Sequence, residues 1–143
     1  MEHVDYVHTR GMTEADLDAR LRGGSHGVLA LADADDAYGV PLSYHYDGDR
    51  ILLRVSAADD QGEKARFIES TVTATFVCYE ATETGSWSIL IRGPLERWPA
   101  DVDESTLDEW FPPFRLFGEA VDDVEFHLYE LRMDAVTGRE TVE

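Results

Sequence analysis

Lysine is nearly absent from this sequence: Lys64 is the single lysine, beside eleven arginines. Asp and Glu together number 30 against 12 Lys and Arg, so the formal net charge is -18 at pH 7. Nucleic acids and anionic membrane surfaces are bound through basic patches, and this chain excludes both as partners. Molar salt shortens the Debye length to about 3 Å and screens such self-repulsion. We therefore expect a salt-adapted cytoplasmic protein, the alternative being an acidic protein from an ordinary cytoplasm.

Cysteine and long apolar runs are also scarce. The lone Cys78 cannot form an internal disulfide, and its neighbours Phe76, Val77 and Tyr79 are typical of an inert strand residue in a reducing compartment. The longest apolar runs, such as residues 28–32, are too short to span a bilayer. The first residues lack the basic and apolar regions of a secretory signal. We expect a soluble, intracellular protein.

No self-contained catalytic motif is present. The sequence has no Gly-x-Gly-x-x-Gly, phosphate loop, Gly-x-Ser-x-Gly or Cys-x-x-Cys. Its five histidines are scattered without the spacing of metal ligands, so we expect no metal site. The acidic residues are too numerous for one catalytic pair to be chosen. Motifs therefore assign no catalytic residue.

The remaining pattern is that of one β-rich domain over residues 1–143. Thr13 and Asp16 resemble a capping box, and Asp47-Gly48-Asp49 suits a hairpin turn. Gly93-Pro94 indicates a bulge or an edge, and the apolar phase of the last strand slips near Leu131. Period-two alternation and apolar or β-branched runs predict six strands, and helical spacing predicts three helices. The strands lie at 27–32, 38–46, 51–56, 71–79, 87–98 and 124–133, and the helices at 13–22, 63–70 and 101–111. Short strands with small helices favour a closed antiparallel barrel over a βαβ sheet.

One group of residues is suited to bind an anion. Arg54 and Ser56 are two apart on a predicted strand, so both side chains project from the same face. Lys64 lies at the start of the following helix, where free N–H groups and the helix dipole favour a phosphate. Together they could bind one phosphate. The alternative is a strand arginine paired with a neighbouring aspartate.

The order of several segments resembles the pyridoxamine 5'-phosphate oxidase-like, FMN-binding split β-barrel family. The resemblance covers residues 13–98 and, loosely, the last strand. Its segments are Gly-Val-Leu-Ala-Leu-Ala at 27–32, Val-Pro-Leu-Ser at 40–43, Tyr-Asp-Gly-Asp at 46–49, Ile-Leu-Leu-Arg-Val-Ser at 51–56, Gly-Glu-Lys-Ala-Arg-Phe at 62–67 and Trp-Ser-Ile-Leu-Ile-Arg-Gly-Pro-Leu-Glu at 87–96. It implies a mainly β fold, a six-stranded antiparallel split barrel of Greek-key type with short flanking helices.

The same resemblance implies a homodimer with one FMN per subunit in the groove between two barrels. Lys64 would hold the FMN phosphate, and three strand segments would supply the other contacts. Arg54, Val55 and Ser56 would lie near the phosphate. Leu42, Ser43 and Tyr44 would lie along the isoalloxazine ring, where backbone groups can bond its polar edge. Ser86, Trp87 and Ser88 would contact the flavin from a further strand, of the same or the partner subunit.

Two departures from the family bear on the substrate. Pyridoxamine phosphate oxidases usually carry an Arg-Lys pair where this chain has Glu63-Lys64. They also end in an Arg-rich, Trp-containing segment that binds the substrate phosphate, whereas residues 132–139 here read Arg-Met-Asp-Ala-Val-Thr-Gly-Arg. We therefore expect a substrate other than pyridoxamine phosphate.

The resulting hypothesis is an FMN-dependent oxidoreductase acting on a small molecule, with a nicotinamide or a deazaflavin as electron donor. The flavin would carry the redox chemistry and the protein would position and shield it. The alternative is a non-catalytic protein that sequesters or senses flavin, or holds haem.

The roles of four ring side chains remain to be placed. Trp87 suits either a flavin contact or barrel packing, and Trp98 and Trp110 suit the core or a dimer interface. His45 is expected at the surface, the alternative being a proton donor near the flavin.

Overall fold

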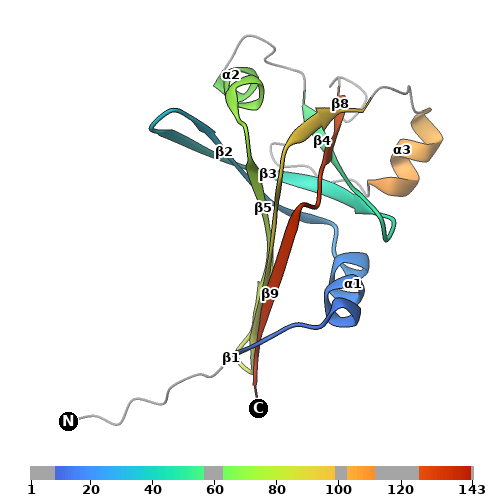
Figure 1. Ribbon diagram of the computed structural model, residues 1–143. Coiled ribbons are helices and arrows are strands. Elements are labelled where there is room, and N and C mark those ends of the chain that lie inside the picture. Colours follow the sequence, from blue (N-terminus) through green and yellow to red (C-terminus); the bar gives the residue numbers. More distant parts are fainter. Residues whose placement is uncertain (1–8, 57–62, 99–102, 112–125, 143) are drawn as a thin grey trace.

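The computed structural model describes residues 9–56, 63–98, 103–111 and 126–142 (Figure 1). The predicted acidic loop at 58–62 and the predicted helix stop at Pro112 and Pro113 lie outside these residues. The elements in chain order are β1 (Thr9–Gly11), α1 (Glu14–Gly23), β2 (His26–Asp33), β3 (Asp36–Tyr46), β4 (Ile51–Ser56), α2 (Glu63–Ser70), β5 (Ala74–Ala81), β6 (Ser86–Gly93), β7 (Leu95–Arg97), α3 (Glu104–Trp110), β8 (Phe126–Leu131) and β9 (Ala135–Thr141).

Local sequence signals start two of the helices. The Thr13 hydroxyl accepts a hydrogen bond from the Asp16 N–H, and the Asp16 carboxylate accepts one from the Thr13 N–H, both at 3.1 Å. This confirms the predicted capping box at the start of α1. The carboxylate of Asp103 accepts from the Thr106 N–H at 2.8 Å, so α3 begins at Glu104 with Asp103 as its cap.

The β3–β4 hairpin turns where Asp47-Gly48-Asp49 predicted it. Gly48 has a φ of 102°, in the left-handed region that favours glycine. The Asp47 carboxylate accepts hydrogen bonds from the N–H groups of Asp49 and Arg50, both at 2.9 Å. The turn sets the register of the hairpin, in which Tyr46 pairs with Ile51.

The sheet has nine described strands, and the prediction of six is wrong in number although right in class. The segment predicted as a strand over 87–98 divides at Pro94, which has no N–H for a sheet ladder. Two strands were missed, β1 and β9, whose side chains are small or polar and give little apolar alternation. The strand predicted from residue 71 begins only at Ala74, because the Thr71 N–H still donates to the Phe67 carbonyl of α2 at 2.9 Å.

The strands form an antiparallel barrel that is closed by one long ribbon. Their order is β1-β9-β6-β5-β2-β3-β4-β8-β7. β6 and β7 are successive parts of one segment, and so are β8 and β9; β6 pairs with β9, and β7 with β8. Because this ribbon meets β5 through β6 and β4 through β8, it joins the two sides of the sheet.

The ribbon contains the predicted bulge. Between its two paired stretches, Gly93 and Pro94 face three residues, Arg132, Met133 and Asp134. The Arg132 N–H donates to the Pro94 carbonyl at 3.0 Å. A Cβ on Gly93 would lie 1.9 Å from the Arg132 carbonyl oxygen, so only glycine fits this close approach.

The core lies inside the barrel and is completed by the helices. Phe67 of α2 is buried and stacks on Tyr38 of β3, with ring centroids 5.1 Å apart. None of the helices in the described ranges is long and apolar enough to cross a bilayer. In Figure 1, α2 lies at one end of the molecule and α1 toward the other. The main buried cluster comprises Leu21, Leu29, Leu31, Leu42, Tyr44, Ile51, Leu53, Val55, Phe67, Ala74, Phe76, Cys78, Ile89, Ile91 and Leu131.

Candidate functional site

Ser43 and Arg54 are brought together on the outer face of β3 and β4. They are direct cross-strand partners, so their side chains leave the sheet on the same side. Ser43 is only 9% exposed. The Arg54 guanidinium lies 5.8 Å from the centroid of the Phe111 ring. This hydroxyl and guanidinium form the polar centre of the predicted site.

The two residues beside Ser43 point the other way. The side chains of Leu42 and Tyr44 belong to the buried cluster, and the Tyr44 hydroxyl donates to the Leu21 carbonyl at 2.7 Å. The Tyr44 N–H donates to the Ser25 carbonyl at 2.9 Å. A flat ligand on the outer face could therefore meet the Ser43 side chain and the strand backbone, but not the Leu42 or Tyr44 side chains.

Tyr44 and Cys78 form a buried pair of weak acids within the barrel. Burial raises the pKa of the Cys78 thiol to about 12, and burial together with Cys78 raises the pKa of Tyr44 as well. Both groups stay protonated at physiological pH. This agrees with the prediction that Cys78 is an inert strand residue rather than a nucleophile.

The end of β4 leads toward α2. Val55 is buried in the core, on the face opposite Arg54, and pairs with His127 of β8. Ser56 ends the strand opposite Phe126. Arg54 is one of the β4 residues predicted to lie near the phosphate. The structure places its side chain on the outer face of the sheet.

Lys64 lies in the first turn of α2 and is half-buried. It makes no ion pair with any residue that the structure describes. The nearby Arg66, by contrast, forms ion pairs with Asp33 at 3.8 Å and Asp36 at 3.2 Å, and lies 4.4 Å over the Phe67 ring. Arg66 thus attaches α2 to the β2–β3 hairpin.

The predicted contacts on β6 are divided by strand alternation. Ser88 pairs with Tyr79 on the outer face of the sheet, and Ser86 projects to the same side. Trp87 projects to the other side, where it packs against the buried cluster. Because β5 and β2 separate β6 from β3 in the sheet, these residues do not meet Ser43 and Arg54 within one subunit.

An apolar row crosses the outer face of the sheet. Val28, Val77, Leu90 and Thr137 are successive cross-strand partners on β2, β5, β6 and β9. Leu90 is 40% exposed, and Tyr79 in the next row is 66% exposed. Large apolar side chains gathered on one sheet face are typical of an interaction surface.

His45 lies on the outer face of the sheet, but it is less exposed than expected because Trp110 covers its ring. It is half-buried and stacks on Trp110 of α3, with centroids 4.9 Å apart and planes 7° from parallel. Burial lowers its pKa, against the opposing effect of the Asp47 and Glu109 carboxylates. The side chain could not be placed from sequence because Trp110 is remote in the chain. The guanidinium carbon of Arg50 lies 5.0 Å from the centroid of the Trp98 ring.

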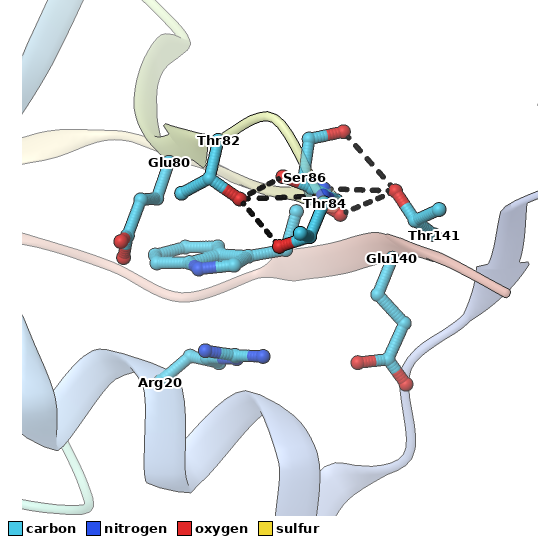
Figure 2. Close-up of a pocket in the computed structure, with 9 residues that line it drawn as sticks. Arg20, Glu80, Thr82, Thr84, Ser86, Glu140 and Thr141 are labelled. Atoms are coloured by element: carbon cyan, nitrogen blue, oxygen red, sulfur yellow. Dashed lines mark hydrogen bonds between the residues drawn. The ribbon is translucent and has the colours of Figure 1, made fainter. Parts of the chain in front are cut away.

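A pocket lies between the β5–β6 hairpin and α1 (Figure 2). Its cavity volume is about 250 Å³. The Nε1 atom of Trp87 is buried and has no hydrogen-bond partner among the described residues. The pocket could not be predicted from sequence, since α1, β6 and β9 meet only in the fold. The lining residues are Arg20, Glu80, Thr82, Thr84, Gly85, Ser86, Trp87, Glu140 and Thr141.

Metal-ligating side chains are not gathered in the described parts of the chain. Within those ranges, no group of three or more His, Cys, Asp or Glu side chains could hold a metal ion.

A family model described as pyridoxamine 5'-phosphate oxidase matches residues 13–140. A search of curated proteins finds no match. The family model covers all the predicted site residues, and it extends beyond the segments on which the sequence resemblance rested.

Solved structures share the fold. An FAD-binding protein from Mesorhizobium loti is 18% identical with a TM-score of 0.70, the alignment covering 96% of this chain and 100% of that one. The FAD-binding protein from Mycobacterium smegmatis is 15% identical with a TM-score of 0.64, covering 92% and 98%. A heme-binding protein from Mycobacterium smegmatis is 20% identical with a TM-score of 0.58, covering 87% of this chain and 53% of that one. These likenesses establish the split-barrel fold.

Proposed function

The chain belongs to the pyridoxamine 5'-phosphate oxidase family, and from this premise we propose that it is an FMN-binding oxidoreductase that acts on a small molecule in a salt-adapted cytoplasm. The observation that carries the proposal is the cross-strand pair Ser43–Arg54, together with Lys64, which has no ion pair with any described residue. The chain has a net charge of -18. These three groups are hydrogen-bond donors suited to an anion, and Lys64 makes no ion pair with a carboxylate of the described residues.

The donor set fits a phosphate. A hydroxyl, a guanidinium and an ammonium supply neutral and charge-assisted hydrogen bonds, and the first turn of α2 adds backbone N–H groups. One Lys and one Arg match the charge of a phosphate dianion such as that of FMN. A bound flavin would supply the redox chemistry, while the outer face of β3 and β4 would orient it.

We further propose a homodimer in which each flavin lies between two subunits. The row of Val28, Val77 and Leu90 supports this, as does exposed Tyr79 beside it. Ser88 projects from the same face and could therefore reach a flavin held by the partner. Sedimentation in molar KCl should give the mass of a dimer, and Leu90→Asp should shift it toward the monomer and weaken FMN binding. A wild-type monomer that binds FMN fully would contradict this arrangement.

The phosphate role of Lys64 is tested by FMN titration in molar KCl, followed by flavin fluorescence. Lys64→Ala should lower the affinity about 10- to 100-fold, because a charge-assisted hydrogen bond contributes about 1.5–3 kcal/mol. Lys64→Arg should retain most of the affinity. The matched control is Arg132→Ala, which removes one positive charge from an exposed pair with Glu96 at 3.8 Å. Equal affinity in all four proteins would remove Lys64 from the site.

Catalysis is tested separately from binding. The purified protein should be yellow, and chromatography of the released flavin should identify FMN rather than FAD. A reduced nicotinamide or deazaflavin should bleach the flavin, and a small-molecule acceptor should then restore the colour with turnover. Binding without bleaching by either donor would favour a flavin-sequestering protein, and a colourless protein that takes up no added FMN would rule out both roles.

A further inference from the structure

The phenyl ring of Phe111 lies at the end of α3 and is almost completely buried. The Phe111 N–H donates to the Leu107 carbonyl at 2.8 Å, which fixes the backbone from which the ring extends. The residue is only 1% exposed, although α3 is a helix of seven residues on the outside of the barrel. Other groups therefore cover the ring, and they include a residue proposed to bind the flavin phosphate.

A small apolar cluster on the outer face of β4 receives this ring. Leu52 alternates along β4 with residues of the main buried cluster, so its side chain leaves the opposite face, yet it is only 2% exposed. Among the described residues, Leu52 and Phe111 are the buried apolar side chains that stand outside the main buried cluster. Leu52 is the cross-strand partner of His45, whose ring meets Phe111 edge-on at 6.5 Å. Phe111 thus lies beside the cross-strand pair Ser43–Arg54.

Arg54 lies two residues beyond Leu52 on β4 and projects from the same face. Its guanidinium carbon is 5.8 Å from the centroid of the Phe111 ring, within the range of a cation–π contact. The Arg54 Nε atom is buried, whereas the residue as a whole is half-buried and keeps part of its surface open to a ligand. A flexible arginine that rests on an aromatic ring occupies fewer orientations, so it loses less entropy when it binds an anion. The ring can therefore raise the affinity for an anion without contacting it.

We propose that Phe111 is a positioning residue of the phosphate site: its ring holds the Arg54 guanidinium in the orientation that binds the flavin phosphate. This role rests on the proposed function, in which Arg54 and Lys64 bind that phosphate. Because the ring contacts the guanidinium, Phe111 should affect the binding of the phosphate alone. A merely structural role for Phe111 would instead alter the binding of the whole flavin.

The test compares FMN with riboflavin, which has the same ring system but no phosphate. Both are titrated in molar KCl and followed by flavin fluorescence, and the ratio of the two affinities measures the contribution of the phosphate. Phe111→Leu keeps an apolar side chain and removes the flat ring. It should lower this ratio about three- to tenfold, because Arg54 must then be ordered on binding. Phe111→Met, whose flexible side chain fills irregular gaps, replaces the leucine variant if that variant does not fold.

Two controls separate positioning from a general loosening of α3. Trp110→Leu removes the neighbouring ring of the same helix, which stacks on His45 at 4.9 Å, and it should leave the ratio unchanged. Arg54→Ala should itself lower the ratio. Adding Phe111→Leu to that variant should cause no further fall, because the group that Phe111 positions is gone. Urea unfolding of each variant checks that the titrated protein is folded.

The outcomes distinguish the role of Phe111 from the proposed function as a whole. An unchanged ratio in Phe111→Leu, an equal fall in Trp110→Leu, or a further fall when Phe111→Leu is added to Arg54→Ala would each overturn the positioning role. If Lys64→Ala lowers the ratio while Phe111→Leu does not, the phosphate site stands and Phe111 has no part in it. A wild-type protein that binds FMN and riboflavin equally, or binds neither, would overturn the phosphate site and the role of Phe111 together.

Discussion

The two faces of β3 attach two helices by different chemistry. Tyr44 and Tyr46 leave one face and contact α1, whereas His45 between them leaves the other face and contacts α3. Three consecutive residues thus fasten opposite sides of the barrel. The stability of these two attachments differs in its dependence on pH, and the α3 side lies beside the proposed site at Ser43 and Arg54.

The α1 side is held by directional hydrogen bonds. The Tyr44 hydroxyl donates to the Leu21 carbonyl at 2.7 Å, and the Tyr46 hydroxyl donates to the Asp18 carboxylate at 2.8 Å. Burial, with the Asp18 hydrogen bond, raises the pKa of Tyr46 to about 12. Both phenols therefore remain donors throughout the physiological pH range. This attachment fixes the end of the barrel that contains the pocket lined by Arg20 and Trp87.

The α3 side is held by ring contacts. His45 stacks on Trp110 and meets Phe111 edge-on, with centroids 6.5 Å apart, and Arg54 lies over the same phenylalanine. Stacking is less directional than hydrogen bonding, and the central ring is titratable. Because α3 contacts Arg54, its position determines how much of the Ser43–Arg54 pair a ligand can reach.

The largest effect should come from removing the main anchor of α3. Phe111 is 1% exposed, so Phe111→Ala should lower the free energy of unfolding by about 3–5 kcal/mol. Leu21→Ala, at an equally buried position on α1, is the matched comparison and should cost about 2–5 kcal/mol. Urea unfolding in molar KCl measures both. A cost below about 1 kcal/mol for Phe111→Ala would show that α3 is only loosely attached.

A smaller effect should follow from removing one phenol on the α1 side. Tyr44→Phe leaves the Leu21 carbonyl buried without its donor and should cost about 1–3 kcal/mol. Tyr46→Phe should cost less, about 0.5–1 kcal/mol, because Tyr46 is half-buried and its partner Asp18 is solvated. Equal losses in the two variants, measured by urea unfolding, would contradict the difference in burial.

The smallest effect should be the pH dependence of the α3 side. Burial lowers the pKa of His45, so the unfolded chain, with a histidine pKa near 6.5, takes up a proton first. This contribution to stability is therefore complete above about pH 6.5 and falls as the pH decreases below it, by less than about 1 kcal/mol for a partly exposed ring. His45→Phe keeps the stack and removes the titration. The free energy of unfolding of this variant and of the wild type is measured from pH 7.5 to 5.5. Because the acidic groups are the same in both proteins, the difference between the two curves is the contribution of His45. Parallel curves would exclude His45 as the cause.

Local signals predicted the fold well, and remote contacts explain what they missed. The Thr13 capping box, the Asp47-Gly48-Asp49 turn and the bulge at Gly93-Pro94 each depend on neighbouring residues, and all were predicted correctly. β9 was missed because its apolar alternation is weak: Gly138 is buried there against Leu17 and Met12. Such a contact leaves no trace in the local pattern.

The candidate site was predicted in part. The pairing of Ser43 with Arg54 follows from the register that the hairpin turn sets, so sequence could anticipate it. The stacking of His45 on Trp110 could not be anticipated, because the approach of α3 depends on the path of the whole chain. For the same reason the pocket at Trp87 was not foreseen: Arg20, Trp87 and Glu140 come from three distant segments.

The closing ribbon also sets an order on folding during synthesis. Residues 126–141 pair with four strands, β4, β6, β7 and β1, and follow all four in the chain, so they leave the ribosome after them. Until they emerge, β4 lacks its partner β8 and β6 lacks its partner β9, and each presents an open edge that can recruit another chain. The partly folded chain in which these strands have not yet paired is thus the state most prone to aggregate.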